Sequence, residues 1–256
     1  MKNKLEFAKQ IVFEAGDYLR LHLHDDLMIS KKTGPTDLVT QMDQQVQNDL
    51  VEKITNRYPE DRIFAEEDGL RSPISEGSVW VIDPIDGTNN FVTQKEDFAV
   101  MVAYFEDGIG RFGLIYDVMR DYLFYGGGEF PVYRNDLELT PFVDQPLENF
   151  LIASNVGMLE KNDWGMADLG MDSLGIRVYG SAGISFSKIL SGGILAYFSY
   201  IWPWDYAAAA IMGEQLGYTV LNLNGDKPNY QTVEPIMMVP KVKLTEIQTY
   251  LKKGRS

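Results

Sequence analysis

The stretch WVIDPIDGTNNF, residues 80–91, constrains the fold of this chain more than any other part of the sequence. The apolar run Val79 to Ile82 predicts a buried strand that ends at Pro84 and brings Asp83 and Asp86 to one turn. Two carboxylates so close repel each other, which raises a pKa or requires a cation, and hard divalent ions take oxygen ligands. The stretch therefore predicts a divalent metal site at the end of a buried strand.

The residues that follow predict an anion site beside the metal. Gly87 allows positive φ or a close backbone approach, and the amides and hydroxyls of Gly87, Thr88 and Asn89 then open toward an anion, above all if a helix begins there. The alternative is a strand that simply ends in an Asp-Gly turn, since Asp and Gly are ordinary turn residues. Metal together with phosphate is the chemistry that the first interpretation implies.

Composition excludes several other kinds of chemistry. The sequence has 256 residues, no Cys and two His, so disulfides, zinc thiolate sites and cysteine nucleophiles are excluded, and Ser-His-Asp catalysis has little support. A formal net charge of -14 argues against a nucleic-acid partner. No run reaches the roughly 20 apolar residues of a membrane span, and the first ten residues lack the apolar core of an export signal. We expect a cytoplasmic protein with no membrane partner.

Three further acidic positions have both a functional and a structural interpretation. Asp43 follows Thr40 at the spacing of a capping box, and Asp205 lies near the start of an Ala-rich helix, where capping explains it. Glu66 begins the acidic turn after the predicted strand 62–65, which places it within ligand reach if that strand lies beside Asp83. Gly180-Ser181-Ala182 opens another helix, as an anion site or as ordinary packing of helix on strand.

Periodicity predicts a mixed α-β chain. Helical spacing appears near both ends, and residues 98–134 alternate short apolar runs with turns, which predicts an antiparallel meander. Within it, GIGRFG at 108–113 matches the dinucleotide-binding pattern. That motif must open a helix, whereas Leu114 to Tyr116 continues as a strand, so we predict a hairpin rather than a dinucleotide loop.

Four motifs in this order resemble the inositol monophosphatase family of magnesium-dependent, lithium-sensitive phosphatases: AEEDG at 65–69, the central stretch at 80–91, GSA at 180–182 and WDYAA at 204–208. The resemblance implies a five-layered α-β-α-β-α sandwich and a homodimer. It also implies a single domain over residues 1–256. Its N-terminal half, about 1–148, would carry most metal ligands, and its C-terminal half, about 149–256, would carry Asp205 and the substrate pocket.

The resemblance also implies roles for individual residues. Glu66, Asp83 and the carbonyl of Ile85 would bind a first Mg2+, Asp83, Asp86 and Asp205 a second, and a third, weaker ion would lie near Glu66; Mn2+ is an alternative ion. Thr88 and Asp43, with Glu66, would activate the attacking water. The substrate contacts would come from the phosphate-binding turn, the second helix start, the pocket and a loop, namely Gly87, Thr88, Asn89, Gly180, Ser181, Ala182, Ser199 and Lys32.

One position departs from the family pattern. Where inositol-specific relatives have an acidic residue six positions before the metal-binding Asp205, this chain has Ser199. A shorter, neutral side chain weakens polyol recognition and leaves room for a bulkier ester. Hydrolysis of inositol monophosphate is therefore the first hypothesis for the small-molecule phosphate ester. NADP(H), fructose-1,6-bisphosphate and 3'-phosphoadenosine phosphates are the alternatives, with a non-catalytic interaction protein as a remote one.

Overall fold

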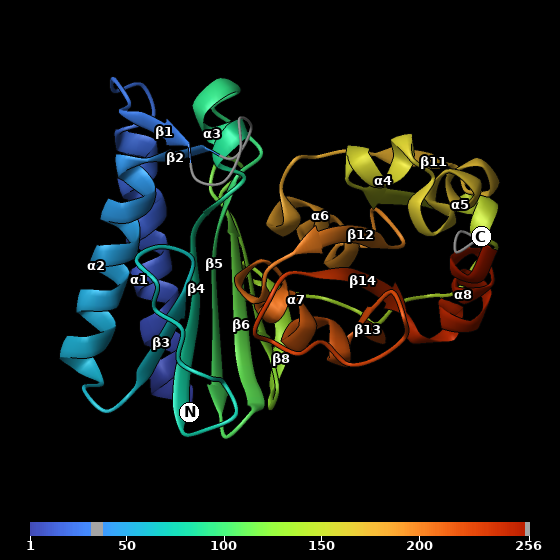
Figure 1. Ribbon diagram of the computed structural model, residues 1–256. Helices are drawn as coiled ribbons and strands as arrows, with labels where there is room; N and C mark the ends of the chain where they lie inside the picture. Colours follow the sequence, from blue (N-terminus) through green and yellow to red (C-terminus); the bar gives the residue numbers. More distant parts are fainter. Residues whose placement is uncertain (32–37, 254–256) are drawn as a thin grey trace.

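The computed structural model describes residues 1–31 and 38–253, which form two β-sheets with helices between and outside them (Figure 1). Helices α1 (Lys2–Leu21) and α2 (Gln41–Arg57) cover the outer face of the first sheet. Between them, β1 (Ile29–Lys31) and β2 (Leu38–Thr40) pair antiparallel. No helix of the described residues is long and apolar enough to cross a membrane.

The first sheet has seven strands in chain order, β3 to β9. Its strands are β3 (Arg62–Ala65), β4 (Ser78–Asp86), β5 (Ala99–Glu106), β6 (Ile109–Asp117), β7 (Tyr122–Gly127), β8 (Phe130–Arg134) and β9 (Leu137–Glu138). Strands β3 and β4 are parallel and the others antiparallel, so the predicted meander is confirmed. The parallel pair aligns Ala65 with Ile82, and the acidic residues that follow these two positions therefore lie side by side.

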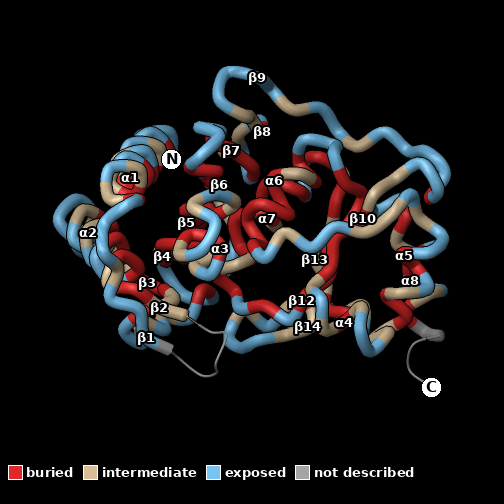
Figure 2. The backbone as a smooth tube through the Cα atoms, turned by 90° about the horizontal axis from the view of Figure 1, so that it is seen from above, coloured by how far each residue is buried: buried red, intermediate tan, exposed pale blue. Residues whose placement is uncertain are grey.

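Helices α6 (Ala182–Leu190) and α7 (Pro203–Gln215) lie between the two sheets and are mostly buried (Figure 2). Strand β6 makes the close approach possible, because a Cβ on Gly113 would overlap the Ala208 carbonyl oxygen and one on Gly110 would overlap the Ile211 side chain. These are two glycines of the GIGRFG motif. The motif lies in the β5–β6 hairpin, as the absence of a helical pattern predicted. Its role in the packing of α7 is a finding of the structure.

The second sheet has five strands in the order β11-β10-β12-β14-β13. They are β10 (Leu151–Ser154), β11 (Gly175–Arg177), β12 (Tyr197–Ile201), β13 (Tyr218–Asn222) and β14 (Glu234–Pro240). The outer face is covered by α4 (Val156–Glu160), α5 (Met166–Asp172) and α8 (Leu244–Lys253). Short helical turns, η1 (Leu147–Asn149), η2 (Asp163–Gly165) and η3 (Lys241–Lys243), complete the chain with α3 (Thr88–Thr93).

Three apolar clusters fill the spaces between these layers. One joins α1 and α2 to the first sheet, a second joins both sheets to α6 and α7, and the third lies under α4, α5 and α8. Each sheet thus buries both faces, and the five-layered α-β-α-β-α sandwich is confirmed. The division of the chain into halves near residue 148 stays a prediction.

Candidate active site

Strand β4 carries two acidic residues at its buried end. The strand continues through Pro84 to Asp86, so the prediction that it ends at Pro84 was wrong. Proline is tolerated because the pairing with β5 is irregular between Asp83 and Asp86, which frees that position from donating to the ladder. Both carboxylates are buried, at 1% and 6% exposure. The irregularity brings them to one site, as the central stretch predicted.

Helix α7 adds a third carboxylate from the other half of the chain. Asp205 lies in the first turn, where its Oδ2 accepts a hydrogen bond from the Trp202 backbone N–H at 2.7 Å. The capping interpretation is therefore correct, and it leaves the rest of the carboxylate facing the other two acids. One oxygen from each of Asp83, Asp86 and Asp205 lies within 4.8 Å of the others.

This arrangement suits a cation. Burial, and then the negative charges of Glu66 and Asp86, raise the pKa of Asp83 well above its ordinary value of 3.8. Burial, followed by the charges of Asp86 and Glu66, does the same to the pKa of Asp205. Among the described residues, the buried Oδ1 of Asp83 has no hydrogen-bond partner. An unpartnered carboxylate oxygen among mutually repelling acids is what a divalent ion would satisfy.

These acids line a cavity of about 140 Å³ together with most of the other predicted residues. Glu66 lies beside Asp83 because its backbone N–H donates to the Ile82 carbonyl at 3.2 Å, which continues the β3–β4 pairing by one residue. The remaining predicted residues on the wall are Ile85, Gly87, Thr88, Asn89 and Gly180. Gly87 adopts φ +89° at the start of α3, and a Cβ there would lie 3.0 Å from Cβ of Ser181. Both uses predicted for this glycine are present.

A pair formed by the half-buried Thr88 and the buried Asp43 lies at the edge of this cavity. Thr88 Oγ1 donates to Asp43 Oδ1 at 2.9 Å and lies 3.1 Å from the Ile85 carbonyl oxygen. The other oxygen of Asp43, Oδ2, accepts from the Thr40 N–H at 2.7 Å and from its hydroxyl at 2.8 Å. Asp43 therefore completes the predicted capping box of α2 and also contacts the threonine that the sequence pairs with it.

Asp86 belongs to the acidic cluster and also connects strand β4 to the start of helix α6. Its Oδ1 accepts from the Ala182 N–H at 3.0 Å, and its Oδ2 accepts from the Gly183 N–H at 2.7 Å and from the Ser181 hydroxyl. The N-terminus of α6 thus binds an anion, as its sequence allowed, and this anion is the Asp86 carboxylate of the same chain. Burial raises the pKa of Asp86, and these three donors oppose the rise.

A second cavity, of about 300 Å³, continues from the acidic one and shares Asp86, Gly180 and Asp205 with it. Ser181, Ala182 and Ser199 line it, together with Asn155 and Tyr197. Ser199 is 4% exposed, and its Oγ accepts a hydrogen bond from Asn155 Nδ2 at 3.2 Å. The walls near Ser199 therefore offer neutral hydrogen-bonding groups.

Comparison with known proteins agrees with the motif order. The model of the inositol monophosphatase family matches residues 1–253. The chain belongs to this family. It is 36% identical over 227 residues to the inositol-1-monophosphatase of Bacillus subtilis, with 86% of each chain covered.

Solved structures within the inositol monophosphatase family share the fold. Staphylococcus aureus IMPase-II bound to inositol monophosphate superposes with a TM-score of 0.86 at 28% identity, over 97% of this chain and 94% of the other. An IMPase/NADP phosphatase complexed with Mg2+ and phosphate gives a TM-score of 0.85 at 26% identity, over 97% and 93% of the chains.

Two residues at this inositol monophosphatase site were not predicted from the sequence. Gln47 of α2 fixes the acidic turn, since its side chain bonds the backbone N–H of Glu67 at 2.7 Å and its carbonyl at 3.0 Å. Asn90 of α3 bonds two backbone carbonyls. Their signal is polarity at positions that a helical pattern buries. Lys32, which the resemblance places in a loop over the metals, lies outside the described residues.

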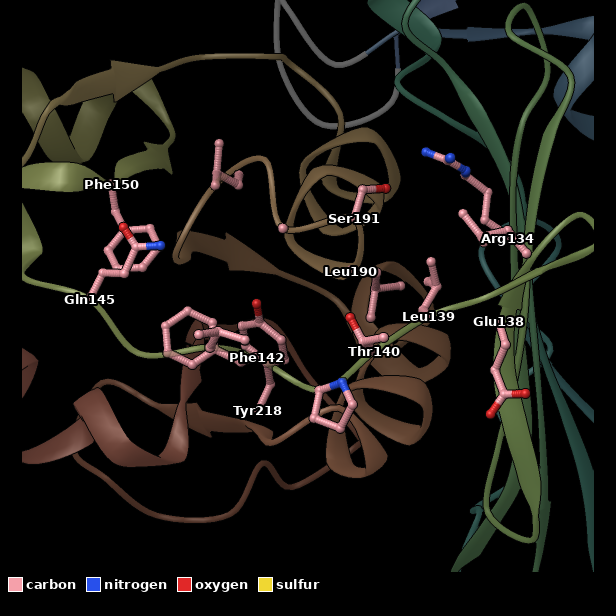
Figure 3. A pocket seen from close by; sticks show the side chains of 15 residues that line it. Arg134, Glu138, Leu139, Thr140, Phe142, Gln145, Phe150, Leu190, Ser191 and Tyr218 are labelled. Atoms are coloured by element: carbon pink, nitrogen blue, oxygen red, sulfur yellow. The ribbon is translucent and has the colours of Figure 1, made fainter.

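A larger cavity of about 420 Å³ (Figure 3) shares no lining residue with the acidic cavity or with the second one. It lies between the segment that follows β9 and the end of α6, where Phe142, Leu190 and Tyr218 provide its apolar wall. None of the predicted site residues lines it. The acidic cavity is smaller, but it is lined by Asp83, whose Oδ1 has no partner among the described residues, and by Thr88, which donates to Asp43.

Proposed function

We propose that this chain is a Mg2+-dependent phosphomonoesterase that hydrolyses inositol monophosphate. The observation that carries the proposal is the meeting of Asp83, Asp86 and Asp205 beside the hydrogen-bonded pair Thr88 and Asp43. Family membership and the identity to the Bacillus subtilis enzyme support the same reaction. Intact acids and an intact pair argue against a non-catalytic relative.

The acidic residues would divide between the metal sites. Glu66, Asp83 and the Ile85 carbonyl would bind one Mg2+, and Asp83, Asp86 and Asp205 another, with a third, weaker ion near Glu66 and Mn2+ as a substitute. Bound there, the cations would lower the pKa of the attacking water and offset the charge of the phosphate. The unpartnered Asp83 Oδ1 supports the assignment of Asp83 as a metal ligand.

The Thr88–Asp43 pair would orient the attacking water and remove its proton. Because Thr88 Oγ1 donates its hydrogen to Asp43, its lone pairs remain available to accept a hydrogen bond from water. As that proton reaches Thr88 Oγ1, the Thr88 proton passes to Asp43 Oδ1. The Gly87 and Thr88 amides would hold the phosphate oxygens, and the water would attack the phosphorus from the side opposite the ester oxygen, which leaves with the alcohol.

The alcohol of the ester would occupy the second cavity, against Ser199 and the Gly180–Ala182 turn. The cavity of about 300 Å³ gives room for a polyol ring. Ser199 also favours a second candidate, because it leaves out the acid that inositol-specific relatives use. NADP(H) is the first alternative ester, since the chain resembles an IMPase/NADP phosphatase at 26% identity. A homodimer is the assembly that we propose.

A phosphate-release screen of the purified protein tests this function. The substrates are inositol monophosphate, NADP, fructose-1,6-bisphosphate and 3'-phosphoadenosine 5'-phosphate, each with Mg2+ or with chelator. We expect release that depends on Mg2+ and the highest kcat/KM for inositol monophosphate. A higher kcat/KM for NADP would identify NADP as the preferred substrate and leave the proposed reaction unchanged. Failure to release phosphate from any of these esters would contradict the proposed function.

A further inference from the structure

Asn90 connects two loops that come from distant parts of the sequence. It lies on α3, two residues after Thr88, and is 6% exposed. Its Nδ2 donates to the Asp97 carbonyl oxygen at 2.9 Å and to the Tyr179 carbonyl oxygen at 2.7 Å. Both hydrogens of the carboxamide are therefore used, one on each loop.

The Tyr179 loop fits tightly against this side chain. Gly180 follows with φ +72°, and a Cβ on it would lie 3.0 Å from Asn90 Oδ1. The next residue, Ser181, caps α6 by accepting from the Ile184 N–H at 3.1 Å, and its hydroxyl donates to Asp86. A displacement of the loop at Tyr179 would thus be transmitted to the start of α6.

This loop forms part of the walls of the acidic cavity and of the second cavity. Gly180 lines both the acidic cavity and the second cavity, whereas Tyr179, Ser181 and Ala182 line only the second cavity. Asn90 itself lines neither cavity. Asn90 therefore does not line the proposed substrate site, and it can affect the reaction only through the position of the Tyr179 loop that it binds.

We infer that Asn90 is a positioning residue that fixes the Tyr179–Ala182 loop and thereby orients the alcohol of the substrate against the acidic cluster. The inference rests on the proposed function, because it assigns the second cavity to the alcohol. The rate of hydrolysis depends most on this orientation when the leaving alcohol is a large group that must be held in one position for the reaction. A small activated ester such as p-nitrophenyl phosphate depends less on that wall.

The test compares Asn90→Ala with Asn135→Ala. Asn135 also makes two side-chain bonds to backbone groups and lines neither cavity: it accepts from the Leu123 N–H and donates to the Asp121 carbonyl. We expect Asn90→Ala to lower kcat/KM for inositol monophosphate by about 10- to 100-fold. The value for p-nitrophenyl phosphate should fall by a clearly smaller factor, and Asn135→Ala should leave the ratio of the two values unchanged.

Hydrogen exchange supplies a readout without turnover. Asn90→Ala should speed the exchange of the Ala182 and Gly183 amides, and Asn135→Ala should not. Equal losses on both substrates, or unchanged exchange at these amides, would overturn the inference. If Asn90→Ala does not fold, Asn90→Asp keeps the shape, removes both donors and is judged by the same two criteria.

The proposed function fails separately from this inference. If the wild type releases no phosphate from inositol monophosphate, the proposed substrate is wrong. The ratio is then measured with the best ester of the screen, and the exchange rates still decide the role of Asn90.

Discussion

The carboxylate of Asp86 accepts a hydrogen bond from the Gly183 backbone N–H at 2.7 Å, so helix α6 begins on a member of the acidic cluster. Asp83, its neighbour in the cluster, has an unpartnered oxygen instead. The two acids that the sequence presents as equivalent therefore differ in what they do for the fold.

Asp86→Asn should destabilise the metal-free protein relative to Asp83→Asn. An amide can accept at only one of its two positions, so donors at the α6 N-terminus lose their partner, and the difference should be about 1 to 3 kcal/mol in the free energy of unfolding. Urea unfolding of both variants in chelator measures it. Equal stabilities would show that the bonds from Ala182 and Gly183 contribute nothing.

Thr88→Val should lower kcat by about 10²- to 10⁴-fold, because the hydroxyl that would accept the water proton is gone while the side-chain volume remains. Thr88→Ser keeps the hydroxyl and is the matched control, which should retain most of the activity. The loss in Thr88→Val combined with Asp43→Asn should be smaller than the product of the single losses. Independent, multiplying effects would contradict a shared proton path.

The metal-free protein should lose stability as pH rises through this cluster's titration. The folded-state pKa values of Asp83 and Asp205 are raised above 3.8, so their protons stabilise the fold at low pH, and that contribution is lost as pH rises toward the folded-state values. In chelator, the Tm of Asp83→Asn minus that of the wild type should therefore grow with pH. A difference that stays constant would contradict the mutual repulsion of these acids.

Ser199→Glu should shift substrate preference toward inositol monophosphate. A carboxylate in the second cavity accepts hydrogen bonds from ring hydroxyls, which should raise kcat/KM by a factor equivalent to about 1 to 3 kcal/mol of transition-state stabilisation. It also repels the additional phosphates of NADP. The structure adds one condition, since Ser199 is buried against Asn155 and the new side chain must turn into the cavity. Kinetics with both esters on both proteins decide whether the ratio moves.

Local patterns predicted the parts of this site that depend on neighbours in sequence. The capping box of Thr40 and Asp43, the turn at Gly87 and the hairpin at GIGRFG all follow from residues a few positions apart. The prediction that the strand ends at Pro84 was wrong because the pairing with β5 is irregular there, so the proline removes no ladder hydrogen bond. That irregularity depends on tertiary structure and cannot be recognised from neighbouring residues.

Contacts between distant segments were beyond what spacing could predict. Asn90 and Tyr179 are far apart in the chain, as are Asp86 and Gly183, and nothing in the period of either segment predicts their pairing. The meeting of Asp205 with Asp83 came from motif resemblance alone. The only local sign of such a long-range bond was an amide residue, such as Gln47, at a position that the helical pattern buries.

The central claim is tested most directly by the rate of phosphate release from inositol monophosphate as Mg2+ is increased, measured on the wild type and on Asp83→Asn. The wild type should show no release in chelator and a saturable rise with Mg2+. Asp83→Asn should stay folded and show no such rise at any Mg2+ concentration, because the ligand shared by the two proposed ions has lost its charge. Near-native turnover in Asp83→Asn, or full wild-type turnover in chelator, would contradict the account.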